Sequence, residues 1–110
     1  MNITIEEYSV FPSRVIAGTR GSEGSACLTF SFDESWDGLA KKVLFLLPDG
    51  TRIYKSCRED SVVLPRELMR QRGKSRCYVI GRHGKRRLVS LGIEILVLHT
   101  PVDEGEEEKV

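Results

Sequence analysis

The chain contains few side chains of the kinds that catalyse reactions, and their spacing matches no reaction centre. His83 and His99 are its two histidines. Nucleophilic catalysis needs a base within reach of the nucleophile, and neither histidine lies in a motif that would supply one. The segment RGSEG at 20–24 is one glycine short of a GxSxG nucleophile elbow and lacks the α/β surroundings in which such an elbow works. We therefore expect no enzymatic activity and no catalytic residue.

Cofactor and metal signals are equally weak. Gly18, Gly21 and Gly24 have the spacing GxxGxxG, which matches neither a Walker A loop nor the dinucleotide fingerprint. The acidic residues of the segment DESWD at 33–37 lack the spacing of an EF-hand loop. They predict a solvated acidic turn that caps a short helical turn. We expect no cofactor and no metal.

The three cysteines predict buried thiols. Cys27, Cys57 and Cys77 are odd in number, widely spaced and never form a CxxC pair. This pattern indicates neither a disulfide framework nor a zinc site. Because a free cysteine behaves as a small hydrophobic residue, we expect all three to be unpaired and the protein to reside in a reducing compartment.

Charge is the feature with the clearest functional alternative. The net charge is only +1, but the segment from Arg66 to Arg87 has nine Lys or Arg and one acid, Glu67. The segment DEGEEEKV at 103–110 has five acids. The candidate interaction surface predicted from this segregation consists of Arg70, Arg72, Lys74, Arg76, Arg82, Lys85, Arg86 and Arg87.

This basic stretch has two interpretations. Nucleic-acid binders combine such charge with aromatic platforms or a recognition helix, and Tyr78 is the only aromatic residue nearby. A solvated face, or a face that docks an acidic neighbour, is therefore favoured over nucleic acid. A small nucleic-acid-binding module stays the alternative. A small enzyme or ligand-binding domain, with a site assembled from scattered residues, is a further competing class.

The elements that must position these residues are mostly strands. Residues 26–32 alternate, with Leu28, Phe30 and Phe32 on one face, which is typical of a half-buried strand. The apolar run at 43–47 ends at Pro48-Asp49-Gly50, which predicts a hairpin and a central strand covered on both faces.

The second half of the chain carries a helix signal and another hairpin signal. Pro65 can begin a helix of about two turns in which Leu68 and Met69 face inward, and Gly73 can close it. A second hairpin is predicted around 81–85, and a final strand begins at Ile93. Residues 17–25 predict a mobile surface loop.

The spacing of strands and turns predicts an antiparallel sandwich or a partial barrel. We expect a single domain at 1–102 and a disordered acidic tail at 103–110. No apolar run is long enough to span a bilayer, and the N-terminus does not have the pattern of a secretion signal, so we expect no membrane association and no export.

The order of these elements resembles small β-sandwich proteins of phage and prophage tail modules, including the N-terminal domains of baseplate or receptor-binding appendage proteins. Their loose pattern is a strand, a Trp-x-Gly turn, a strand ending in Phe, a hairpin, an apolar-Pro-x-Glu segment, a glycine and a closing hairpin. The resemblance covers about residues 14–98. The positions that carry it are Trp36, Gly38, Phe45, Pro65, Glu67, Gly73 and Gly81.

The resemblance implies an all-β, immunoglobulin-like sandwich with one short helix. It implies a non-catalytic structural part of a virion whose partners are other tail or baseplate proteins, with a homo-oligomer as a further option. The protein would then be found in the bacterial host cytoplasm during assembly and later in the virion. The pattern around Trp36 predicts an indole that folds under its turn into the core, because it follows the strand face of Leu28, Phe30 and Phe32, and Leu39 lies three residues further on.

Overall fold

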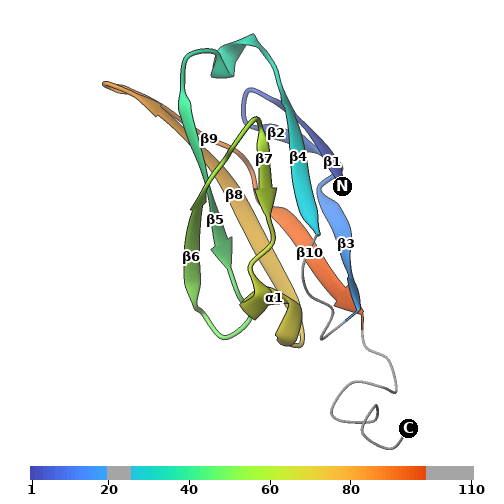
Figure 1. Cartoon of the computed structure of the whole chain (residues 1–110). Coiled ribbons are helices and arrows are strands. Elements are labelled where there is room, and N and C mark those ends of the chain that lie inside the picture. The colour runs from blue at the N-terminus through green and yellow to red at the C-terminus, as the bar shows by residue number, and fades with distance from the viewer. Residues whose placement is uncertain (20–25, 99–110) are drawn as a thin grey trace, which may run out of the picture.

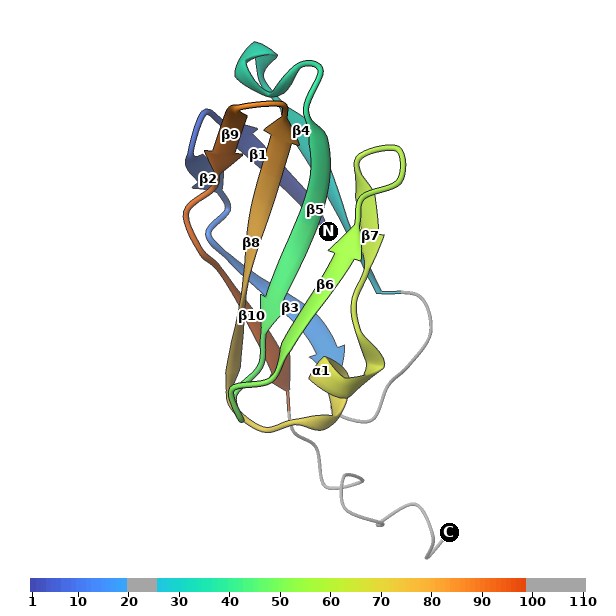
Figure 2. The same cartoon turned by 90° about the vertical axis from the view of Figure 1, so that its left-hand side faces the viewer.

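The computed structural model describes residues 1–19 and 26–98, which form two mixed sheets that face each other (Figures 1 and 2). The smaller sheet has the order β2-β1-β4-β7, and its strands are β1 (Asn2–Glu6), β2 (Ser9–Phe11), β4 (Cys27–Phe32) and β7 (Ser61–Val63). The larger sheet has the order β3-β10-β8-β5-β6, with β9 beside β8. Its strands are β3 (Arg14–Thr19), β5 (Ala40–Leu46), β6 (Arg52–Ser56), β8 (Lys74–His83), β9 (Arg86–Val89) and β10 (Ile93–Leu98). The expected all-β class is confirmed.

Each sheet contains a parallel pair, so the expected antiparallel order does not hold throughout. β1 runs parallel to β4, and β3 runs parallel to β10. Parallel neighbours need a long connection, which intervening strands supply here. Turn residues in the sequence predict only hairpins between consecutive strands. The two parallel pairings join distant segments and could not be predicted from them.

Both predicted hairpins are present. β5 pairs with β6 around a turn in which Gly50 has φ 90°, and the Asp49 carboxylate accepts a hydrogen bond from the Thr51 backbone N–H at 2.8 Å. β8 pairs with β9 around Gly84, which has φ 58°. A glycine is favoured at both turns because positive φ strains other residues.

Three local predictions need correction. β5 is central, as expected, but its outward residues Leu44 and Leu46 are only half-buried, so one face of the strand has no second layer over it among the described residues. Residues 17–19 belong to β3 and not to a loop. The expected helix of about two turns is the short segment α1 (Arg66–Arg70), although Leu68 and Met69 are buried as predicted.

Several predicted features lie outside the described residues. They are the loop residues 20–25, His99, the domain boundary at 102 and the acidic tail at 103–110.

Trp36 is a core residue, as predicted. It ends the 3-10 turn η1 (Glu34–Trp36) and has 0% of its surface exposed. Its Nε1 donates to the Glu7 carbonyl at 2.7 Å, and its ring centroid lies 5.1 Å from that of Phe32. A Cβ at Gly81 would lie 2.8 Å from Trp36 Cζ3, so only glycine lets β8 pass this closely over the indole. The ring therefore fills the space between the two sheets next to the η1 turn.

Candidate functional site

The larger sheet turns a chemically distinct face outward. Register fixes which side chains share this face, because directly paired residues point to the same side of a pleated sheet. Leu44 pairs with Tyr78, Lys42 with Ile80, and Arg82 with Arg87. We call this the cationic face; its charged members are Arg14, Lys42, Arg52, Lys74, Arg76, Arg82, Glu94 and Arg87.

A belt of apolar and aromatic side chains crosses the middle of the cationic face. Tyr54 of β6 is 54% exposed, and its neighbours along the belt are half-buried. The belt consists of Leu44, Leu46, Tyr54, Tyr78 and Ile80. Exposure of aliphatic side chains to water is unfavourable. Single exposed apolar residues are common on protein surfaces, but these residues form a continuous apolar surface.

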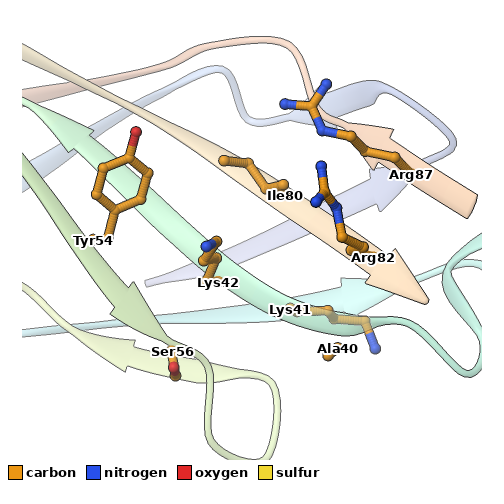
Figure 3. A pocket seen from close by; sticks show the side chains of 8 residues that line it. All are labelled: Ala40, Lys41, Lys42, Tyr54, Ser56, Ile80, Arg82 and Arg87. Carbon is orange, nitrogen blue, oxygen red and sulfur yellow. The ribbon is translucent and has the colours of Figure 1, made fainter. Parts of the chain in front are cut away.

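A hollow of about 510 Å³ lies at the end of the face nearest the β8–β9 turn (Figure 3). Tyr54 stands on one side of it, Ile80 and Lys42 lie along its floor, and Arg82 and Arg87 stand on the other side. None of the described residues that line it is acidic.

The two arginines beside this hollow are electrostatically unsatisfied within the described chain. Arg82 and Arg87 pair directly across β8 and β9, where like charges repel each other. None of the carboxylates in residues 1–19 and 26–98 forms a salt bridge with either guanidinium. An anionic group that docked between them would relieve this repulsion.

The end of the cationic face near α1 is partly neutralised. Arg14 Nε donates to Glu94 Oε2 at 3.0 Å across the parallel β3–β10 pair. This hydrogen bond, followed by the nearby charge of Lys74, lowers the pKa of Glu94 below its ordinary range, and Arg76 adds to the effect. Positive charge therefore exceeds negative charge at this end also.

The predicted basic stretch does not form one patch. Lys74, Arg76, Arg82 and Arg87 lie on the cationic face. Lys85 lies in the β8–β9 turn. Arg70 ends α1 and Arg72 follows it, at the opposite end of the sheet from that turn (Figures 1 and 2).

Arg86 points away from the cationic face because it alternates with Arg87 along β9. Its guanidinium donates to the backbone carbonyls of Ser35 and Asp37. It therefore binds the η1 turn to β9 and acts as a structural residue.

The face also contains residues that lie outside the predicted basic stretch, among them Arg14 and Glu94. Lys42, Arg52 and Tyr54 lie far from the basic stretch in sequence, and the β5–β6 and β5–β8 pairings bring them beside it. The alternation of buried and outward residues along each strand could have identified the basic residues of β5 that share this face. Lys42 alternates with the buried Val43 on β5, as Arg76 alternates with the buried Cys77 on β8.

The other candidate groups have structural roles. The acidic turn caps η1: Asp33 accepts hydrogen bonds from the Ser35 backbone N–H and hydroxyl and from the Glu7 N–H, and the Ser35 hydroxyl bond is the main reason that the pKa of Asp33 is lowered. Among the described residues, His, Cys, Asp and Glu form no group of three or more that could hold a metal ion.

The prediction of buried thiols is confirmed only for Cys77, because Cys27 and Cys57 are half-buried. The thiols of Cys57 and Cys77 are poor nucleophiles. Burial raises the pKa of Cys77 to about 12, and burial followed by the charge of Asp60 raises that of Cys57 to about 11. Both remain protonated near neutral pH, and the thiolate is the reactive form.

No protein-family model matches the sequence, and no curated protein matches it. Within the described residues, no helix has the length and apolar character needed to cross a membrane.

Proposed function

We propose that this protein is a non-catalytic structural module of a phage or prophage tail or baseplate, built on an immunoglobulin-like sandwich and acting through protein–protein contacts. The observation that carries the proposal is the cationic face, where a largely half-buried apolar belt is bordered by arginines. Protein interfaces combine an apolar centre with a polar rim and are enriched in tyrosine and arginine.

The residues that carry the resemblance to tail proteins support the proposal, because two of them are physically coupled: Gly81 leaves room for Trp36, as described above. Two others have local packing roles, since Gly73 has φ 104° and lies against Pro48, and Pro65 is buried and precedes α1. The Trp36 turn and β8 are therefore packed together.

The proposed role is tested by the neighbouring genes and by the composition of tail particles. We expect neighbours that encode tape-measure, baseplate or lysis proteins. We also expect mass spectrometry to detect the chain in tail particles purified after prophage induction in the source organism. Metabolic neighbours together with absence from purified particles would reject the proposal.

A nucleic-acid-binding module is the second candidate, because Tyr54 and Tyr78 share the cationic face with several cations. Aromatic side chains beside cations bind single strands by stacking and phosphate contacts. Binding of labelled oligothymidylate or duplex DNA at micromolar affinity or better in 150 mM salt would make this candidate the leading one.

A further inference from the structure

The apolar belt of the cationic face has the composition of an interface centre. Leu44, Leu46 and Ile80 come from two adjacent strands and form a continuous half-buried surface on the outward side of the sheet. In an exposed sheet face that meets only water, these positions are usually polar. An apolar surface on a partner would cover the belt and remove it from water.

Cations border the belt at both ends. Arg82, Arg87 and Lys42 lie toward the β8–β9 turn, and Arg52 and Arg76 lie toward α1. Arginine forms bidentate hydrogen bonds with carboxylates and keeps its charge at any pH at which a protein folds. The arrangement is therefore complementary to a partner that has carboxylates around an apolar centre.

The two tyrosines offer a limited stacking surface for bases. Lys42 Nζ lies 5.5 Å from the centroid of the Tyr54 ring, so one face of this ring already contacts a cation. The Tyr78 ring packs against Gly92, since a Cβ there would lie 3.1 Å from Tyr78 Cε1. The remaining belt residues are aliphatic and offer no ring to a base. These contacts favour a protein partner over a single-stranded nucleic acid.

We propose that the cationic face docks an acidic protein surface, with an apolar side chain of the partner entering the hollow between Tyr54 and Arg82. Carboxylates of the partner bind Arg82 and Arg87 and relieve their mutual repulsion. This inference rests on the proposed function, which it deepens by naming the docking face and the chemistry of the partner.

The first test uses the purified full chain and a defined probe. The probe is a synthetic peptide with a Leu-Val-Tyr-Leu centre and three glutamates at each end; one control peptide replaces the centre with serines and glycines, and another replaces the glutamates with lysines. We expect the probe to bind at least about tenfold more tightly than either control. Equal affinity for the probe and the serine-glycine peptide would overturn the proposed role of the belt.

Charge reversals locate the binding. Arg82→Glu should weaken binding of the probe peptide by about tenfold or more, because it removes a cation and adds a carboxylate to the face. Arg58→Glu is the matched control, because it makes the same change in net charge at a different place. Arg58 lies beside β7 of the smaller sheet. We expect less than about a twofold effect from it. Equal effects of the two variants would show that only net charge matters and would overturn the inference, as would oligothymidylate displacing the probe at micromolar concentration in 150 mM salt.

The second test uses assembled tail particles and separates the inference from the proposed function. A photo-crosslinking residue is introduced as Tyr54→p-benzoylphenylalanine on the cationic face or as Thr29→p-benzoylphenylalanine on the outer face of the smaller sheet. Crosslinking from position 54 to a tail protein, at a site rich in Asp and Glu, supports the inference. A chain that is present in particles but crosslinks only from position 29 overturns the docking face and leaves the proposed function intact. Absence of the chain from particles rejects the proposed function, and the peptide measurements still decide the binding chemistry.

Discussion

The outer faces of the two sheets have the same pleat but opposite chemistry. The outward positions of the larger sheet carry long cationic side chains around an apolar belt. Those of the smaller sheet carry mainly short hydroxyl and amide side chains, which we call the hydroxyl face: Asn2, Thr4, Thr29, Ser31 and Ser61. At its edge, Phe11 of β2 is paired with Thr4 and is 77% exposed.

Alternation alone therefore does not identify a functional face. β4 and β8 both alternate between buried and outward residues. The outward hydroxyl residues of β4, Thr29 and Ser31, end close to the backbone and are exposed. Those of β8 reach across neighbouring strands, where arginine stems can lie along leucine and tyrosine and keep the charged groups in water. A strand therefore becomes part of a docking surface through the side chains that its neighbours place beside it.

The largest expected effect concerns the core that both faces share. Trp36→Ala should lower the free energy of unfolding by about 3 to 5 kcal/mol, because it deletes a fully buried aromatic ring and its hydrogen bond to Glu7. Urea denaturation followed by circular dichroism measures this change. A melting temperature within about a degree or two of the parent would show that the ring is not a core anchor. Tyr54→Ala, on the cationic face, is the control and should be nearly neutral because its side chain is largely exposed.

The next largest effect is on the pH dependence of stability, and it arises from a buried thiol rather than from either outer face. The folded state keeps the Cys77 proton up to about pH 12, whereas the unfolded chain releases it from its ordinary value of 9.0. Stability from this group is therefore fully present below pH 9 and is lost as the pH rises toward 12, by up to about 1.4 kcal/mol per pH unit.

Cys77→Ala should flatten the decline in unfolding free energy between pH 9 and 11, although Cys57, with its own raised pKa, still contributes. Guanidinium denaturation at several pH values, under reducing conditions, measures the two slopes. Identical slopes in parent and variant would contradict the raised pKa. Thiol counting in denaturant without reductant should separately recover all three thiols.

Adjacent arginines of β9 offer a sharper comparison. Arg86→Ala should lower the free energy of unfolding by about 1 kcal/mol, because it removes hydrogen bonds from a charged donor to the carbonyls of the η1 turn. Arg87→Ala should leave stability nearly unchanged and weaken binding of the acidic probe peptide. Thermal melts and peptide titrations of the two variants check both expectations. The reverse pattern would show that the assignment of the two residues to opposite sides of β9 is wrong.

The smallest expected effect on stability comes from the acidic segment at 103–110. Its deletion should leave the melting temperature nearly unchanged and modestly strengthen salt-sensitive binding of the acidic peptide, since it removes five negative charges that repel an acidic peptide. Exposed ion pairs contribute about 1 kcal/mol or less each and are screened by salt. Titrations at 50 and 300 mM salt should show the gain only at the lower concentration. Unfolding on deletion would show that this segment is part of the fold.

The local elements could be predicted from the sequence alone. Alternation predicted β4 and its buried face, turn residues predicted the β5–β6 and β8–β9 hairpins, and the surroundings of Trp36 predicted a core position. These features depend on residues that are close in sequence, so side-chain periodicity and glycine conformation suffice to specify them.

Which strands are neighbours, and therefore which cations act together, depends on long-range pairing in the fold. The parallel pairs β1–β4 and β3–β10 join distant segments, and the β5–β8 pairing brings Lys42 beside Ile80. The same geometry separates Arg86 from Arg87, which are adjacent in sequence but on opposite sides of one strand. Proximity in sequence grouped the basic residues incorrectly, because a strand directs successive side chains to opposite faces and a sheet assembles each face from several strands.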